Sequence, residues 1–167
     1  MTTNAMQAGP FDPPQVVWVP VSARLASARL ASMGISVGIP FVGAVVAAAL
    51  TSIAWLWAIP AVLALLGVWL LWLIPRQVRA VGYAERADDL LIRKGIMFRS
   101  MVVVPYGRMQ YVDVEAGPLA RAFGIASVQL HTASQGTDAV IDGLPPEEAA
   151  RLRDQLASRG EARLAGL

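Results

Sequence analysis

The sequence predicts a membrane-spanning α-helical hairpin followed by a small α+β domain, in which two antiparallel β-sheets or a partly open barrel are capped by a C-terminal helix. Three observations lead to this fold class. The run 30–75 contains no Asp, Glu, Lys, Arg or His. Short β-rich segments separated by turn residues come next. The last segment begins with two prolines and two glutamates, which is typical of a helix N-terminus.

The uncharged run is too long for one membrane span. A spanning helix needs about 20 apolar residues to cross a hydrocarbon core of about 30 Å. We therefore expect a first span at about 31–50 and a second at about 58–75, joined by a turn at 51–57. Trp55 and Trp57 in this turn suit the membrane–water interface, where an indole ring keeps its N–H in contact with water.

These spans divide the chain into four parts. They are an extended or disordered tail at 1–21, the hairpin at 22–79, the globular domain at 80–160 and a frayed end at 161–167. The tail contains several Gly and Pro residues and lacks the basic and apolar regions of a cleaved signal peptide. Ser22 follows the tail, and its hydroxyl can cap the first helix.

The first span carries small residues and a proline. Gly34 and Gly38 are four positions apart, and this spacing allows two helices to approach closely in lipid, here against the second span. The alternative is that glycine and alanine are simply common in membrane helices. Pro40 removes a backbone donor and is expected to kink this helix.

Four arginines flank the hairpin and predict its orientation. Arg24 and Arg29 precede the first span, Arg76 and Arg79 follow the second, and the turn between the spans has no positive charge. Positively charged flanks stay on the cytoplasmic side. We therefore expect a multi-pass protein of the cell membrane with both termini and the domain in the cytoplasm. The same arginines are candidates for lipid contact, although generic attraction to anionic lipid explains them without a specific site.

The domain consists mainly of β-rich segments. Val112 and Val114 alternate with acidic residues, and Val128 and Leu130 alternate with polar ones, as in half-buried strands. The expected strands are 81–86, 90–93, 96–104, 111–115, 125–132 and 139–142. The expected connections are a turn at 87–89, a short helix at 118–124 and a loop at Gln135 and Gly136.

An amphipathic helix follows the last strand. Pro145 and Pro146 suit its start, and two acidic residues then lie near the positive end of the helix dipole. One face of this helix is apolar and is formed by Ala149, Leu152 and Leu156. We expect this face to close the sheets.

Composition argues against several classes of function. The chain has no cysteine, which removes disulfides, thiol nucleophiles and thiolate metal sites. Positive and negative side chains nearly balance after the hairpin, so we expect no binding of nucleic acid. His131 is the single histidine and is better explained as a structural residue than as a metal ligand, and Asp88 and Asp89 suit a turn better than catalysis. Common nucleotide-binding and hydrolase motifs do not occur, so we expect no cofactor and no enzyme activity.

Three motifs stand out in the domain: 90–95 (LLIRKG), 103–112 (VVPYGRMQYV) and 117–125 (GPLARAFGI). Together they resemble the bacterial pleckstrin-homology-like (PH-like) domain of the small membrane proteins called YdbS-like. The second motif is similar to a Val-Pro-x-x-Arg-Ile-Gln-x-Val signature of that family, with Met109 where isoleucine is usual. The third is similar to its Pro-Leu-x-Arg-x-Phe/Leu-Gly signature. The motif residues to which we assign a structural role are Gly95, Pro105, Arg108, Gln110, Pro118, Arg121 and Gly124.

The resemblance implies a PH-like fold of two antiparallel sheets closed at one end by the C-terminal helix, and no established enzyme activity. It also implies a partner, because such proteins are sometimes accompanied by a larger membrane protein with several copies of the domain; a homo-oligomer is a further option. We expect Arg108 and Arg121 to bond to backbone carbonyls or to Asp113 or Glu115. Eukaryotic PH domains bind phosphoinositides through basic residues where this chain has the acidic turn 87–89, which disfavours that ligand.

These inferences lead to a binding or scaffold module that is anchored at the cytoplasmic face and engages the lipid bilayer or other membrane proteins. The alternative is an accessory subunit of a membrane transport, export or envelope-stress complex, with Gly34, Gly38 and Gly43 facing a partner. An enzyme acting on lipid or envelope substrates is the weakest hypothesis. It would require a deep pocket that holds an acidic residue beside His131.

Overall fold

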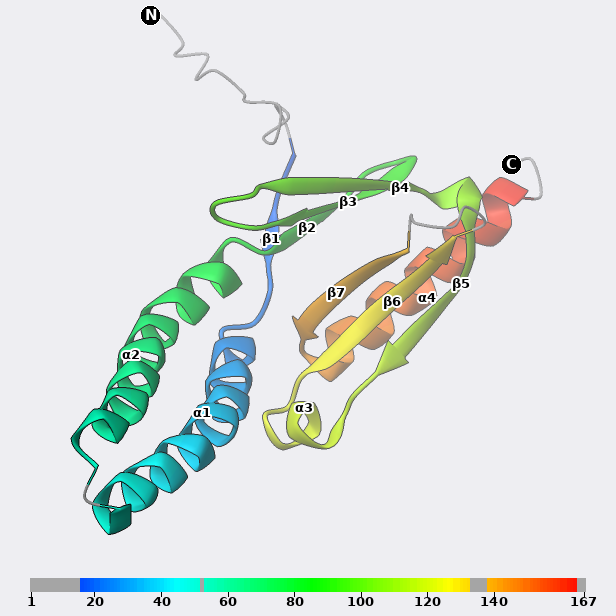
Figure 1. Cartoon of the computed structure of the whole chain (residues 1–167). Coiled ribbons are helices and arrows are strands. Elements are labelled where there is room, and N and C mark those ends of the chain that lie inside the picture. The colour runs from blue at the N-terminus through cyan, green and yellow to red at the C-terminus, as the bar shows by residue number, and fades with distance from the viewer. Residues whose placement is uncertain (1–15, 52, 133–137, 165–167) are drawn as a thin grey trace, which may run out of the picture.

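Two long helices run side by side and form the hairpin (Figure 1). The computed structural model describes residues 16–51, 53–132 and 138–164. Helix α1 covers Arg24–Thr51, helix α2 covers Ala58–Arg79, and the short 3-10 helix η1, Ala54–Trp57, lies between them. Both expected spans lie within these helices, and each helix continues beyond its span toward the domain.

Helix α2 runs past Pro75, where the sequence predicted its end. Val78 lies one turn further on and is buried in the core of the domain. The residue before a proline normally avoids helical geometry, which is why the sequence predicted an end at Pro75. The packing of Val78 instead keeps the chain helical past the proline. Pro40 likewise lies inside α1.

The glycines of α1 do not pack tightly against α2. A Cβ atom placed on Gly34, Gly38 or Gly43 would meet no atom of α2 within 4 Å. The expected close approach of the helices at Gly34 and Gly38 is therefore wrong. These two glycines instead line an apolar groove of about 310 Å³ between the helices, together with Gly67 of α2.

The hairpin is an insertion between two paired strands. Strand β1 (Val19–Pro20) lies antiparallel to β2 (Gly82–Glu85), with Val19 opposite Tyr83. The stretch 1–21 was expected to be a tail, but its last residues belong to the domain. Its first part, residues 1–15, lies outside the described residues. The chain enters the sheet, leaves it to form both long helices and returns to the neighbouring strand.

The strands form two antiparallel sheets, with the orders β1-β2-β3-β4 and β5-β6-β7. The other strands are β3 (Asp89–Lys94), β4 (Ser100–Pro105), β5 (Met109–Glu115), β6 (Ala126–Thr132) and β7 (Ala139–Leu144). The 3-10 helix η2 (Tyr106–Arg108) precedes β5, and the short helix α3 (Pro118–Ala122) links β5 to β6. The two sheets and the final helix confirm the fold class predicted from the sequence.

Strand β4 begins at Ser100, whereas the sequence predicted a strand from Ile96. Gly95 has a φ of +93°, and Lys94 pairs with Ser100 across the turn. Only glycine adopts such a conformation at little cost, so the chain reverses there and Ile96 belongs to the turn. The loop expected at Gln135 and Gly136 lies outside the described residues.

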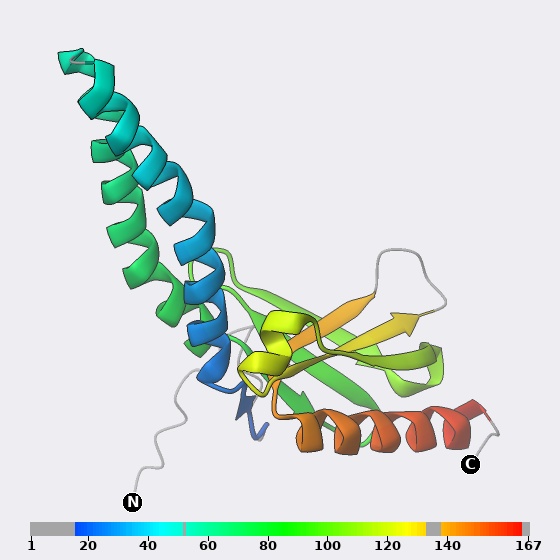
Figure 2. The same ribbon diagram turned by 90° about the horizontal axis from the view of Figure 1, so that it is seen from below.

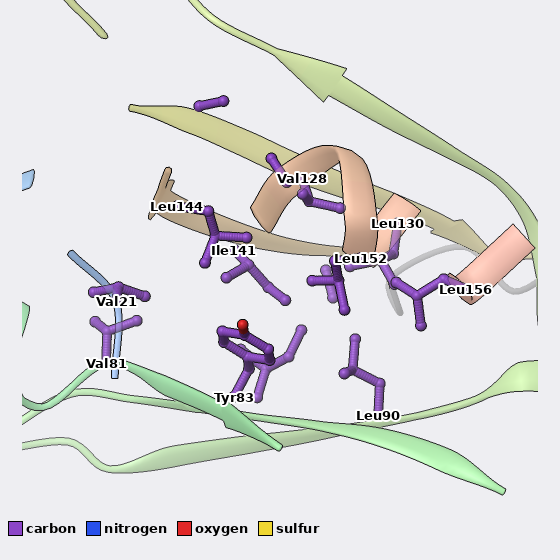
Figure 3. Packing of buried hydrophobic residues seen from close by; sticks show 14 of the residues in the cluster. Val21, Val81, Tyr83, Leu90, Val128, Leu130, Ile141, Leu144, Leu152 and Leu156 are labelled. Atoms are coloured by element: carbon purple, nitrogen blue, oxygen red, sulfur yellow. The ribbon is translucent and has the colours of Figure 1, made fainter. Parts of the chain in front are cut away.

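Helix α4 (Pro146–Leu164) packs between the two sheets and completes the core. Figure 3 shows Leu152 and Leu156 of this helix between Leu90 of one sheet and Leu130 of the other. All four side chains are fully buried. The helix continues past residue 160, where a frayed end was expected, and ends at Leu164.

The described connections from β2 to β6 alternate between two ends of the domain (Figure 2). Strand β2 starts where α2 ends, and each antiparallel strand reverses direction. The β3–β4 turn and α3 therefore lie at the end next to the long helices, and α3 contacts α1. The β2–β3 turn and η2 lie together at the far end, where the N–H of Tyr106 donates to the carbonyl of Asp88.

Candidate functional site

The long helices and the domain share one hydrophobic core where they meet. Leu25 of α1 and Val78 of α2 are buried in the same cluster as Leu144 of β7. Val21 and Val81, which stand at the two ends of the hairpin, lie close to Leu144 (Figure 3). Fully burying such a side chain is worth about 1.5–3 kcal/mol. The hairpin is thus held to the domain by packing as well as by its two chain connections.

Gly143 brings the start of α1 against the end of β7. Its carbonyl accepts a hydrogen bond of 2.9 Å from the N–H of Ser22, whose hydroxyl in turn accepts from the N–H of Arg24. Gly143 has a φ of +79°, and a Cβ atom placed there would lie 2.6 Å from Cβ of Leu25. Sequence reasoning missed this contact, although the Asp-Gly pair at 142–143 is a turn signal that marks a special backbone position.

Arg29 also joins α1 to β7. Its Nη2 lies 3.2 Å from Oδ2 of Asp142, and Oδ1 of Asp142 accepts a hydrogen bond from Ser127. Both side chains of the ion pair are 38% exposed, so the pair contributes about 1 kcal/mol or less. Arg29, which was a candidate for lipid contact, is therefore engaged within the protein.

The other three flanking arginines lie at the same end of the hairpin and are exposed. The guanidinium of Arg76 stacks on the ring of Trp72 at 3.8 Å. Arg24 lies next to Gly124: a Cβ atom added to Gly124 would be 3.2 Å from Nη1 of Arg24. Arg79 ends α2. The antiparallel hairpin thus brings all four flanking arginines to the same end of the long helices, beside the domain.

A hollow of about 400 Å³ opens between the long helices and the β3–β4 turn. Arg29 and Gln77 line it from the helices, and Asp142 lines it from β7. Lys94 and the apolar tip of the turn close the other side. This hollow combines polar groups with an exposed apolar edge at the base of the hairpin.

The two long helices expose apolar side chains that no other described part of the chain covers. In the most apolar stretches of the two helices, only 6% and 11% of the residues are buried. A core helix of a soluble protein would be mostly buried. Both helices are long and apolar enough to cross a membrane.

A charged network ties α4 to β2. The Tyr83 hydroxyl donates to Glu148 at 2.6 Å, and Arg151 donates to both carboxyl oxygens of Glu148 and to Glu85. Hydrogen bonds from Arg151 lower the pKa of the Glu148 carboxyl below its ordinary value of 4.5, against the opposing effect of burial. Burial, followed by the hydrogen bond to Glu148, raises the pKa of the Tyr83 hydroxyl.

We expect Glu148→Gln to lower the free energy of unfolding at pH 7 by about 1–2 kcal/mol, because the network is only partly exposed. The folded pKa lies below 4.5, so the carboxylate stabilises the fold above that pH and loses its effect as the pH falls through the folded pKa. The variant should therefore also show a flatter loss of stability in acid. Thermal unfolding of the full chain in detergent at pH 7 and pH 4, followed by circular dichroism, measures both effects.

The matched control is Glu147→Gln, which removes a neighbouring exposed carboxylate with no hydrogen bond to another described residue. Glu147 also lies in the first turn of α4, near the positive end of the helix dipole, so its loss should lower the stability at pH 7 by about 0.3–1 kcal/mol at most, which is less than for Glu148→Gln. Equal behaviour of the two variants would contradict the role given to Glu148.

Comparisons with known proteins place this arrangement in a family. A family model described as bacterial PH domain matches residues 26–160, which is most of the chain. This chain belongs to the bacterial PH domain family. It is also 36% identical over 97 residues to the UPF0699 transmembrane protein YdbS of Bacillus subtilis (strain 168). That match spans 54% of this chain and 60% of the relative, and no solved structure matches. The resemblance to YdbS-like proteins is confirmed.

Several motif residues of the PH domain have clear backbone roles. Gly95 and Gly124 both have positive φ, of 93° and 62°, which favours glycine. Pro118 occupies the first turn of α3, where its missing N–H costs nothing. Gln110 lies at the register shift in β5. Pro105 ends β4 opposite Asp89.

The two motif arginines of the PH domain lack the bonds expected of them. Arg108 and Arg121 are exposed, and neither side chain forms a hydrogen bond or ion pair with another residue in the described ranges. Glu115 instead accepts a hydrogen bond of 2.6 Å from Gln129, and Asp113 lies 4.0 Å from His131. The network that holds the far end uses Arg159, which donates to the Tyr106 hydroxyl.

His131 lies on the outer face of the second sheet of the PH domain. Its ring stacks on Tyr111 with centroids 4.3 Å apart, and its Nδ1 lies 3.3 Å from Oδ2 of Asp138. Within the described part of the chain, no group of three or more acidic, histidine or cysteine residues is placed to hold a metal ion. His131 and Asp113 do not line the hollows described above.

Proposed function

We propose that this chain is a two-pass membrane protein that holds its PH domain at the cytoplasmic surface as a non-catalytic binding module. The single observation that carries the proposal is the insertion of the hairpin between β1 and β2. Two connections and a shared core join the domain to the helices, so it cannot swing freely as it would on a flexible linker. A module held in this way meets other membrane components at a raised effective concentration.

The charges at the base of the hairpin support the cytoplasmic placement. Arg24, Arg76 and Arg79 are exposed at the end of the helices that faces the domain. The opposite end, at Ala54–Trp57, carries no charge. Positive residues remain on the cytoplasmic side during insertion, so both termini and the PH domain belong there.

The proposed ligands are membrane components, namely lipids of the bilayer or other membrane proteins. A larger membrane protein with several copies of the same domain, as the resemblance implies, is one such partner. The family description names a domain type and no reaction, in line with a binding role.

Crosslinking in native membranes, followed by purification of the full chain, tests this binding role. We expect the same partner protein in independent preparations, or a preference for particular lipids when the protein is reconstituted in vesicles of different composition. The proposal is wrong if no partner recurs and binding is equal for all lipids.

A second candidate is an accessory subunit of a transport, export or envelope-stress complex. It is favoured by the apolar groove of about 310 Å³ between the helices, which Gly34 and Gly38 leave open. A helix of another membrane protein would fill such a groove by close packing in lipid.

Filling the groove tests this candidate. We expect Gly34→Leu with Gly38→Leu to reduce the apparent size of the complex on native gels, because the new side chains occupy the space of the partner helix. The sequence analysis placed Gly43 on the partner face as well, but Gly43 does not line the groove, although it is equally open, so Gly43→Leu serves as the control. An unchanged complex in the double variant would show that the groove faces lipid.

A further inference from the structure

We propose that the β3–β4 turn of the PH domain is a second membrane contact, whose apolar tip (Ile96, Met97 and Phe98) enters the interfacial zone of the leaflet that the helices cross. This inference rests on the two-pass arrangement proposed above. It assigns a lipid-binding role to a part of the domain distinct from the spanning helices and from the flanking arginines.

The tip exposes apolar surface to an unusual degree. Met97 is 82% exposed and Phe98 is 88% exposed, which makes them the most exposed large apolar side chains among the described residues after the hairpin. Ile96 beside them is exposed as well. Single exposed apolar residues are ordinary, but consecutive ones at the tip of a turn mark a contact surface.

The backbone presents this tip in a defined conformation. Strands β3 and β4 pair up to Lys94 and Ser100, directly at the turn. A Cβ atom on Gly95 would lie 2.0 Å from the carbonyl oxygen of Phe98, so the tight turn depends on glycine at that position. The apolar side chains thus stand on a paired hairpin and not on a long loop, which lowers the entropy lost on insertion.

The position of the turn identifies lipid as its occupant. Ile96, Met97 and Phe98 line the same hollow as Arg29 and Gln77. Arg29 directly precedes the uncharged run, and Gln77 lies in the last turn of α2, so both mark the level at which the bilayer begins. Figures 1 and 2 show the turn beside this end of α2. Apolar groups that bind an interface enter it by about 5–10 Å, a depth within reach from this level.

The charges around the tip fit the headgroups of anionic phospholipids. Lys94 and Arg99 flank the apolar residues, and Arg93 stacks on Trp18 at 4.5 Å. The segment 93–99 contains no acidic residue. Burial of apolar area and attraction of basic residues to anionic lipid both contribute to binding at a membrane interface, and this turn offers both.

The absence of cysteine from the chain allows a direct test with single-cysteine variants. Met97→Cys and Phe98→Cys are labelled with an environment-sensitive fluorophore in the full chain, which is reconstituted in vesicles containing phosphatidylglycerol. Ala87→Cys labels the exposed turn at the far end of the domain, and Val46→Cys labels a lipid-facing position of α1. Iodide in the water and nitroxide-bearing lipids in the bilayer then serve as quenchers.

We expect the labels at Met97 and Phe98 to be quenched several-fold less by iodide than the label at Ala87, and to be quenched by the nitroxide lipids. In a Lys94→Gln, Arg99→Gln background, this protection from iodide should decrease. Near-UV circular dichroism confirms that each variant is folded.

Three results would overturn the inference. In the first, iodide quenches the Met97 and Phe98 labels as strongly as the Ala87 label, while the nitroxide lipids quench the Val46 label. The turn then lies in water, and the two-pass arrangement of the helices is still supported. If the Val46 label is also open to iodide, the two-pass arrangement fails, and the inference fails with it. If protection at the turn appears in native membranes and not in these vesicles, a protein covers the turn instead of lipid.

Discussion

Replacing Gly143 with alanine is expected to lower the free energy of unfolding by about 2–5 kcal/mol, the sum of backbone strain at positive φ and an overpacked contact. The φ of +79° is unfavourable for any residue with a Cβ, and that Cβ would lie 2.6 Å from Cβ of Leu25. The start of α1 would have to move away from β7, which breaks the hydrogen bond from Ser22. Hydrogen exchange of the full chain in detergent should show faster exchange at the Ser22 amide and in β7.

The matched control is Gly160→Ala in α4. A Cβ atom there would have the carbonyl oxygen of Tyr106 as its nearest neighbour, at 3.8 Å, which is an ordinary contact. Because alanine is better than glycine inside a helix by up to about 1 kcal/mol, this variant should be as stable as the parent or slightly more stable. Equal destabilisation by both substitutions would contradict the role assigned to Gly143.

Placing a charge at Val21 should have an effect of similar size. Val21 is 7% exposed and belongs to the core that the helices share with the domain. An unpaired carboxylate in such a position costs about 3–5 kcal/mol. We therefore expect Val21→Asp to unfold the domain at lower urea concentration, although the residue precedes both the hairpin and the family match.

Val17→Asp provides the comparison for this prediction. Val17 lies in the same segment and is 83% exposed, so the same substitution should leave the urea midpoint almost unchanged. If Val21→Asp were equally mild, the segment before α1 would not be part of the folded domain.

The hairpin and most strands could be predicted because each depends on a local pattern. The uncharged run determines where the long helices lie, and the alternation of Val112 and Val114 with acidic residues identifies β5. The short helix at Pro118 and the buried face of α4 likewise follow from neighbouring residues.

Features that join distant parts of the chain could not be predicted in this way. Strand β1 is short and contains Pro20, so it has no strand pattern, and it becomes a strand only through pairing with β2 across the whole hairpin. The ion pair of Arg29 depends on Asp142, which is remote in sequence. The apolar residues after Gly95 resemble a buried strand, so the sequence predicts a strand there. The positive φ of Gly95 instead reverses the chain, and these residues form an exposed turn.

The cytoplasmic placement of the PH domain is the central claim, and cysteine labelling in intact cells tests it most directly. Ala54→Cys lies in the turn between the long helices, and Ala87→Cys lies in the exposed β2–β3 turn of the domain. A maleimide that cannot cross the membrane should label Ala54→Cys in intact cells and Ala87→Cys only after permeabilisation. Labelling of Ala87→Cys in intact cells would contradict the account.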